Sequence, residues 1–287
     1  MKLEYSHVDV FSQRPYGGNS LPVFADSRGL SAEQMLGITK ELRHFEAIFL
    51  QPTDDPCLVR ARVFDLFEEL AFAGHPIIGA AAVLHQFSGL EGSVDWRIEL
   101  PYKTVTIATS RTAHGYFGLL DQGAAEFLGT VGRPQWIAQA FGLEISDLHP
   151  DLPLEVVSTG LRYLIVPVVP GALERARIVR DITTGLCSVS AQFAVLLDDS
   201  TLEIRHWNND GIVEDIATGS AAGTVGAYRL RHGLARGGEM FILNQGRFTG
   251  RPSTIRVQPE GVRERLGHVK VGGDVAFVGR GILEVRP

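Results

Sequence analysis

The chain has 287 residues, of which 45% are hydrophobic and 21% charged, and its formal net charge at pH 7 is −6. This length and composition predict an ordinary globular protein of roughly two domains. The acidic balance, without a stripe of Lys or Arg, excludes nucleic acid as the expected partner, and no run reaches the about 18 apolar residues of a membrane span.

The N-terminus, the cysteines and the histidines carry no sign of export, metal or cofactor. Residues 1–11 alternate as in a strand and not as in a signal peptide, so we expect a cytoplasmic protein. Cys57 and Cys187 lack the spacing of metal or redox motifs, and we expect two buried thiols. The nine histidines are scattered and no nucleotide-binding glycine loop occurs, which predicts no metal and no cofactor.

The first part of the chain is predicted as strand, turn, strand and helix, at residues 3–11, 14–19, 21–24 and 31–43. Ser31 and Gln34 form the pattern of a capping box at the helix start. Met35, Ile38 and Leu42 follow with the helical period. We therefore expect an amphipathic helix here.

After Arg43 the pattern changes from helix to strand, and Glu46 begins a stretch that is otherwise apolar. A carboxylate there is either an edge residue facing solvent or a base whose proton affinity is raised by its surroundings. A further strand is predicted over 57–65. Gly74-His75-Pro76 then opens an apolar run to His85, which predicts a helix buried on all sides, with the proline in its first turn.

The remaining elements follow from the same patterns. Strands are predicted at 95–100, 103–109, 115–119, 155–158, 163–168, 191–197, 202–207, 253–258 and 268–286, helices at 134–141 and 173–180, and a domain connection at 122–132. Between the strands that end at 207 and begin at 253 lies the sequence VEDIATGSAAG. Gly219 permits a sharp turn, Ser220 can cap a helix, and the free N–H groups of that helix would attract a carboxylate.

The two halves of the chain repeat this order of elements. Glu69 and Glu214 lie 145 residues apart, as do Gly74 and Gly219, while Gly18 and Gly160 lie 142 apart. The near-constant offset predicts two structural copies, with the two buried helices directing their N-termini at one cleft between the domains. Such a cleft would favour a small carboxylate ligand. We expect Glu69 and Glu214 to be structural, bracing each turn across the domain boundary.

Several of these motifs together resemble the phenazine biosynthesis PhzF-like family along essentially the whole chain. They are RPYGGN, the helix leading to Glu46, ELAFAGHPIIGAAAVL, STG at 158–160, GIVEDIATGSAAG and NQGRFTGRPS. The resemblance implies an α+β diaminopimelate-epimerase-like fold of two pseudo-symmetric domains, each a mixed, largely antiparallel sheet around a central buried helix. We place the domains at 1–125 and 126–277, with a C-terminal strand at about 278–287 that can return to the first.

The resemblance also implies a cofactor-free isomerase and a homodimer. Glu46 occupies the position of the general acid/base, and His75 and Asp215 would orient the substrate and assist the proton transfer. The predicted substrate-binding residues are Gly74, Gly219, Ser220, Thr218, Asn19 and His44. His75 could alternatively cap its helix, and Asp215 could merely accept N–H bonds of its own turn.

The sequence departs from the family where Ser20, Trp207, Asn208, Asn209 and Ile216 stand. These changes bear on the substrate, because Trp207 could line the cleft or fill the core. The leading hypothesis is a cofactor-independent isomerase that moves a proton on a small carboxylic acid. The alternatives are an epimerase or racemase of a small amino or hydroxy acid, and a non-catalytic protein that binds a small anion. The substrate itself cannot be named from the sequence.

Overall fold

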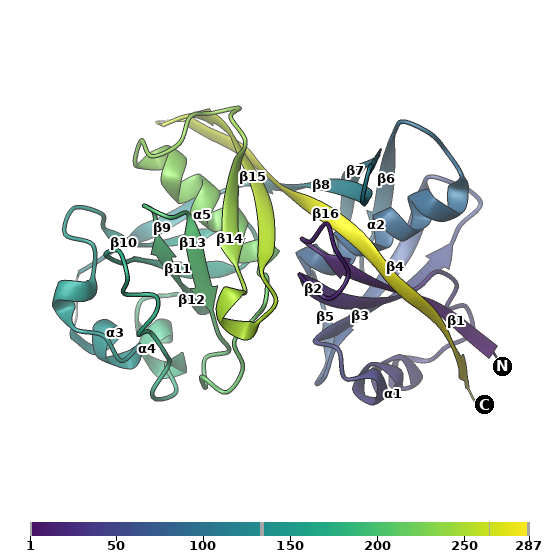
Figure 1. Cartoon of the computed structure of the whole chain (residues 1–287), viewed down its shortest axis with the longest axis horizontal. Helices are drawn as coiled ribbons and strands as arrows, with labels where there is room; N and C mark the ends of the chain where they lie inside the picture. The colour runs from purple at the N-terminus through teal and green to yellow at the C-terminus, as the bar shows by residue number, and fades with distance from the viewer. Residues whose placement is uncertain (1, 133–134, 264, 286–287) are drawn as a thin grey trace. The chain divides into compact units, whose positions relative to one another are not determined.

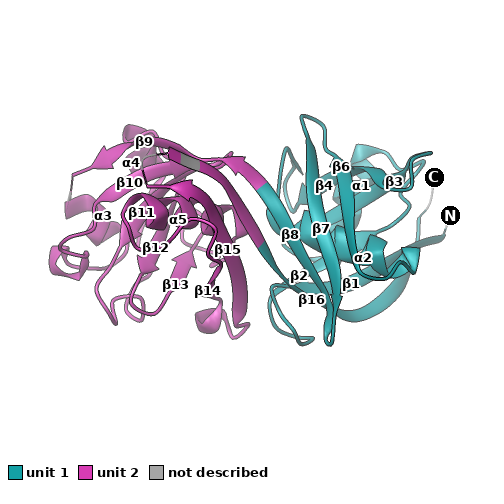
Figure 2. Cartoon of the chain, turned by 90° about the horizontal axis from the view of Figure 1, so that it is seen from above, with its two compact units in different colours: residues 1–121, 272–287 teal, residues 122–271 magenta. Residues whose placement is uncertain are grey.

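The computed structural model describes residues 2–132, 135–263 and 265–285. The chain divides into two compact units, Met1–Asp121 with Gly272–Pro287 and Gln122–Val271 (Figure 2). Strands β8 (Gly115–Ala124) and β16 (Arg265–Glu284) each continue from one unit into the other. The units are called unit 1 and unit 2 below, and each is described by itself.

Unit 1 is a closed ring of strands around helix α2 (Gly74–Ser88), as Figure 1 shows. Its other strands are β1 (Lys2–Val10), β2 (Asn19–Phe24), β3 (Glu46–Pro52), β4 (Leu58–Asp65), β5 (Glu69–Leu70), β6 (Ser93–Glu99) and β7 (Thr104–Thr112). The order is β1-β2-β3-β4-β6-β7-β8-β16, and the ring closes because β1 pairs with β16 as well as with β2. Closure satisfies the edge strands and encloses α2.

The packing of α2 explains its small residues. Every residue from 74 to 83 is buried. A Cβ added at Gly79 would lie 2.5 Å from a Leu21 methyl carbon, so only glycine lets the helix approach β1 and β2 this closely. The predicted helix buried on all sides is confirmed.

Helix α1 (Ala32–Leu42) covers the outer face of the ring at β3 and β4. Its start is fixed by the predicted capping box, in which the Gln34 N–H donates to Ser31 Oγ at 3.2 Å and the Ser31 N–H donates to Gln34 Oε1 at 2.9 Å. Met35 packs with Phe24, Phe49 and other apolar side chains of the outer strand faces.

Unit 2 repeats the plan around helix α5 (Gly219–Arg231), which contacts β10, β11 and β15. Its strands are β9 (Glu126–Val131), β10 (Leu154–Ser158), β11 (Arg162–Pro167), β12 (Phe193–Asp198), β13 (Glu203–His206), β14 (Phe241–Gln245) and β15 (Ser253–Val262). The order from β16 is β15-β14-β13-β12-β11-β10-β9. Two of the strand pairs between β9 and β15 are parallel, β11–β12 and β13–β14. Four are antiparallel, β9–β10, β10–β11, β12–β13 and β14–β15. The predicted mixed, largely antiparallel sheet around a buried helix is therefore confirmed.

Short helices cover the outer face of unit 2. They are α3 (Gln135–Ala140), η1 (Ile145–Asp147) and α4 (Thr183–Ser188), and η2 (Arg247–Thr249) follows β14. Residue 134, where a helix was predicted to begin, lies outside the described residues. Within the described part of the chain, no helix is both long and apolar enough to cross a bilayer.

Two expectations about local structure are wrong, and a third segment has a secondary structure that its sequence did not indicate. The segment 173–180 is not a helix, because the carbonyls of Leu173 and Ala176 accept hydrogen bonds from the Arg205 guanidinium. The expected domain connection at 122–132 starts at the boundary between the two units, and its residues are largely strand, within β8 and β9. Cys57 is partly exposed and Cys187 exposed, since one precedes β4 and the other lies in the last turn of short α4.

Candidate active site

An acid and a base lie together at the N-terminus of α2. Glu46 Oε2 is 3.3 Å from His75 Nδ1, with side-chain exposures of 20% and 7%. Glu46 is the first residue of β3 and His75 the second residue of α2. Helix dipole and N–H groups at this end favour negative charge, so the pair sits where a carboxylate is stabilised and can exchange a proton with an imidazole.

Local structure explains why the chain delivers Glu46 here. Arg43 ends α1 in the left-handed conformation with φ 56°, and its N–H donates to Thr39 O. The chain thereby reverses and enters β3 three residues later. On β3, Ala47 and Phe49 pack in the outer cluster beneath α1. Strand alternation therefore turns Glu46 towards the inside of the ring, where α2 begins.

The other predicted residues of unit 1 lie close in sequence to this pair but have different surroundings. Asn19 is buried at the first position of β2, and Gly74 is the buried first residue of α2. His44 Nδ1 is 2.9 Å from Ser20 Oγ, and Ser20 Oγ is also 2.7 Å from His7 Nε2. The departure from the family at Ser20 thus links two histidines through one hydroxyl.

In unit 2 the turn before α5 holds Asp215. Thr218 Oγ1 donates to Asp215 Oδ2 at 2.6 Å, and the Ala217 N–H donates to Asp215 Oδ1 at 3.4 Å. Gln245 accepts from the Thr218 N–H at 2.8 Å and donates to Asp215 O and Thr218 Oγ1, each at 2.9 Å. Asp215 therefore caps its own turn, as the alternative interpretation of this residue required. The same contacts fix the orientation of its carboxylate.

The first residues of α5 are also held from the side. Ser220 Oγ lies 2.8 Å from the hydroxyl of Tyr163 on β11. Gln122 donates to Gly219 O at 2.9 Å and accepts from the Thr159 hydroxyl at 3.0 Å. A Cβ at Gly223 would lie 1.9 Å from Gln122 Oε1, so the small residues of this helix make room for that amide.

The repeat-related acids brace their turns, but within their own units. Glu69 accepts a bidentate pair from Arg62, at 2.7 and 2.6 Å, and Glu214 accepts one from Arg205, at 2.8 and 2.6 Å. The expected structural role is confirmed. The expectation that they brace across the domain boundary is wrong, because each arginine lies on a strand beside its own turn.

Trp207 fills core. It is 5% exposed and packs in the outer cluster of unit 2 near Phe141, with the Arg205 guanidinium 4.4 Å from its ring centroid. The Trp207 ring, at this departure from the family, therefore packs against Arg205, the residue that braces Glu214.

The structure thus brings together Glu46 with His75, and Asp215 with Thr218. Ser220 lies with Tyr163, while His44 lies with Ser20 and His7. Sequence reasoning missed Gln245, Tyr163 and Gln122. The NQG motif contained the first of these, but nothing in its pattern indicated that its amide would hold the turn of Asp215.

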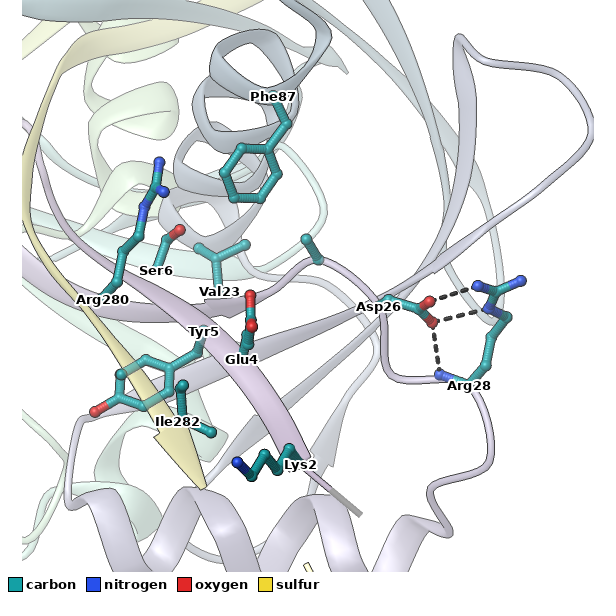
Figure 3. Close-up of a pocket in the computed structure, with 12 residues that line it drawn as sticks. Lys2, Glu4, Tyr5, Ser6, Val23, Asp26, Arg28, Phe87, Arg280 and Ile282 are labelled. Atoms are coloured by element: carbon teal, nitrogen blue, oxygen red, sulfur yellow. Dashed lines mark hydrogen bonds and ion pairs between the residues drawn. The ribbon is translucent and has the colours of Figure 1, made fainter. Parts of the chain in front are cut away.

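A pocket of about 800 Å³ opens elsewhere in unit 1, and Figure 3 shows Phe87, Arg280 and Glu4 around it. Phe87 lies in the last turn of α2, whereas His75 lies in the first. At 1.5 Å per residue, the two ends of this helix are roughly 20 Å apart. None of the predicted site residues lines the pocket, so it is not part of the candidate active site.

Within the described ranges, no group of three or more His, Cys, Asp or Glu side chains is placed to hold a metal ion. The titratable groups around α2 and α5 are instead carboxylates and imidazoles paired with hydroxyls, amides and guanidinium groups. Such an arrangement can hold an acid and exchange protons with it.

Comparison with known proteins identifies the family. The profile of the phenazine biosynthesis-like proteins (PhzC-PhzF) matches residues 8–281. The chain belongs to the phenazine biosynthesis-like family. It is 30% identical over 292 residues to the trans-2,3-dihydro-3-hydroxyanthranilate isomerase of Pseudomonas aeruginosa, covering 96% of this chain and 98% of that protein.

Solved structures agree with this assignment. A predicted epimerase from Pseudomonas aeruginosa superposes with a TM-score of 0.92 at 46% identity, over 99% of this chain and 100% of that one. A probable proline racemase from Agrobacterium radiobacter superposes with a TM-score of 0.62 at 13% identity, over 99% of this chain and 94% of that one, which shows a shared fold alone. The chain is therefore an isomerase of this family with a diaminopimelate-epimerase-like fold.

Proposed function

We propose that this protein is a cofactor-independent isomerase that moves a proton between two carbons of a small carboxylic acid, with Glu46 as the general acid/base. The observation that carries the proposal is the 3.3 Å contact between Glu46 Oε2 and His75 Nδ1 at the N-terminus of α2. A largely shielded carboxylate beside an imidazole has the groups that proton abstraction next to a carbonyl or conjugated system requires.

The reaction balances without a redox partner. The Glu46 carboxylate takes a proton from one carbon, and the electron pair of the broken C–H bond moves into the adjacent π system. The acid proton of Glu46 exchanges with water, and the carboxylic acid then protonates a different carbon, which regenerates the carboxylate. His75 orients the substrate and Glu46 through its ring nitrogens.

For the second unit we propose a binding role. Asp215, fixed by Thr218, orients polar groups of the substrate, and the N-terminus of α5 with Gly219 and Ser220 holds its carboxylate. Gly74, Asn19 and His44 are proposed as further contacts. That the two helix N-termini serve one cleft stays a prediction from the sequence repeat.

The decisive experiment follows deuterium from heavy water into the acid. The first substrate to test is trans-2,3-dihydro-3-hydroxyanthranilate, the acid named for the relative, followed by a panel of cyclic amino and hydroxy acids. We expect label on a carbon other than the one that lost its proton, and Glu46→Gln should lower the rate about 10³-fold. Glu41→Gln, at an exposed position of α1, is the matched control and should keep full activity.

The same experiment separates the alternatives. Label on the carbon that lost its proton, with inversion, would indicate an epimerase or racemase. Ligands that raise the melting temperature but never exchange carbon-bound hydrogen would indicate a binding protein. If Glu46→Gln kept full activity on a true substrate, the proposed role of Glu46 would be wrong.

We also propose that the protein is a cytoplasmic homodimer, on the resemblance alone. Sedimentation equilibrium at micromolar concentration checks the oligomeric state, and a monomer there would contradict it. Fractionation of the producing cells checks the compartment.

A further inference from the structure

His206 is a buried histidine whose two ring nitrogens have different surroundings. It ends β13 and is 6% exposed. Its Nδ1 lies 2.9 Å from the carbonyl oxygen of Ala194 on the neighbouring strand β12. Because a carbonyl only accepts, Nδ1 carries the proton. Burial lowers the pKa of His206, against Asp215 and the Ala194 hydrogen bond, which raise it, so the ring is neutral near pH 7.

In this tautomer Nε2 is a hydrogen-bond acceptor, and no residue in the described ranges donates to it. Nε2 is not one of the fully buried polar atoms that lack a partner in the described residues, so water reaches it although the side chain is only 6% exposed. An acceptor that is open to water in an otherwise buried side chain can accept a hydrogen bond from a donor that arrives with a ligand.

The ring lies at the end of unit 2 where α5 begins. The centroid of the His206 ring lies 5.5 Å from that of Tyr163 and 5.8 Å from that of Phe193, both in edge-on packing. The centroids of the Tyr163 and Phe193 rings are 5.4 Å apart. Tyr163 in turn meets Ser220, the second residue of α5, with 2.8 Å between the two hydroxyl oxygens. Asp215, in the turn before α5, is near enough to act on His206 electrostatically, and its N–H donates to His206 O.

We propose that His206 is a specificity residue of the proposed isomerase, its Nε2 accepting a hydrogen bond from a hydroxyl or amino group of an acid whose carboxylate lies at the N-terminus of α5. This inference rests on the proposed function. The three rings supply an apolar wall beside that position, and Nε2 supplies one acceptor. A site built this way discriminates against an acid without the donor, because that acid would displace water from Nε2 and leave the acceptor unpaired.

Two substitutions separate the two nitrogens. In His206→Asn the amide nitrogen can replace Nδ1 and donate to Ala194 O, but nothing stands at the place of Nε2. In His206→Gln the amide group reaches the place of Nε2 and can present an oxygen there. His114→Asn, at an exposed position of unit 1, is the matched control.

The probes are anthranilate and salicylate, which carry a donor next to the carboxylate, and benzoate, which lacks it. Titration calorimetry should show the wild type binding the first two about tenfold more tightly than benzoate, the factor of one neutral hydrogen bond. His206→Asn should bind all three like benzoate, with the benzoate affinity within about twofold of wild type, while His206→Gln should recover part of the preference. His114→Asn should keep the wild-type ratio.

A spectroscopic measurement tests the tautomer directly. In ¹⁵N-histidine-labelled protein, the His206 Nε2 resonance should be that of an unprotonated nitrogen and should shift on adding anthranilate but not benzoate. A purely structural histidine would not distinguish the probes. The proposal is overturned if His206→Asn keeps the wild-type ratio of anthranilate to benzoate affinity, or if this variant loses as much affinity for benzoate as for anthranilate. It is also overturned if Nε2 is protonated in the wild type, or if the wild type binds none of the three probes.

These outcomes are independent of the proton chemistry. Probe binding requires no turnover, so Glu46→Gln should keep the wild-type ratio between anthranilate and benzoate. Loss of activity in Glu46→Gln with an unchanged ratio in His206→Asn would refute the role of His206 alone. Full activity in Glu46→Gln with a collapsed ratio in His206→Asn would refute the proposed chemistry alone.

Discussion

The turns that lead into α2 and α5 share a plan but treat their acidic residues differently. Each has a glutamate braced by an arginine on an adjacent strand, followed by a glycine that opens a buried helix. At α2 the brace is half-exposed and the site acid, Glu46, comes from another strand to meet His75. At α5 the brace is buried and the site acid, Asp215, is in the turn and is held by Thr218 and Ala217.

This difference suggests a division of labour. A carboxylate whose oxygens already accept hydrogen bonds from its own turn is fixed in direction, which suits an orienting group. A carboxylate next to an imidazole has a partner that can share or exchange a proton, which suits an acid/base. In the proposed reaction, unit 1 would supply the proton carrier and unit 2 the fixed polar groups.

The largest expected effect on the free energy of unfolding is the difference between the two arginine braces. Arg205→Ala should cost about 3–5 kcal/mol of unfolding free energy, because it leaves Glu214 charged and largely buried without a partner. Arg62→Ala should cost only about 1 kcal/mol or less, since both side chains are near 30% exposed and water screens Glu69. Urea unfolding of the two variants measures both values, and equal costs would show that the braces are equivalent.

The support of Asp215 is tested by Gln245→Leu. The change leaves the buried Thr218 N–H without its acceptor and should cost about 1–3 kcal/mol. Denaturant unfolding gives the value, with exposed Gln139→Leu as a control expected within about 0.5 kcal/mol of wild type. A cost no larger than that of the control would mean that water replaces the amide and that Asp215 is not fixed by it.

The contrast between an enclosed and a surface helix is tested with two glycines. Gly79→Ala should destabilise by about 1–3 kcal/mol, because its Cβ would lie 2.5 Å from a Leu21 methyl carbon. Gly37→Ala on α1, where a Cβ meets nothing within 4 Å, should stabilise by about 0.5–1 kcal/mol through the unfolded chain. Thermal unfolding shows both signs, and a stabilising Gly79→Ala would contradict the close packing of α2.

The smallest effect is a dependence of stability on pH from His206. Its pKa in the folded protein is lowered by burial, whereas the unfolded value is about 6.5. The unfolded chain therefore binds more protons below about pH 6.5, and stability falls there by at most about 1.4 kcal/mol per pH unit. His206→Asn should lack this part of the slope in urea unfolding between pH 5 and 7, and identical slopes would show that burial does not hold the ring neutral.

Much of the fold follows from local patterns in the sequence. The capping box at Ser31 and Gln34 located α1, and the runs of small apolar residues after Gly74 and Gly219 located α2 and α5. These signals depend on residues within one or two turns of each other, so tertiary contacts were not needed to interpret them. The helix expected at 173–180 failed because its carbonyls hydrogen-bond to Arg205, a residue from a different part of the chain.

For the site, residue types and their spacing were enough to indicate which chemistry is available. Glu46 in an apolar stretch, His75 beside a helix start and two glycine turns at a constant offset are all recognisable from residue types and their spacing. Which groups meet became visible in the folded chain: Glu46 with His75, Asp215 with Thr218 and Gln245, and His206 with Ala194 and Tyr163. The physical reason is that strand pairing and the enclosure of α2 and α5 bring together residues far apart in the chain, and no local pattern encodes those distances.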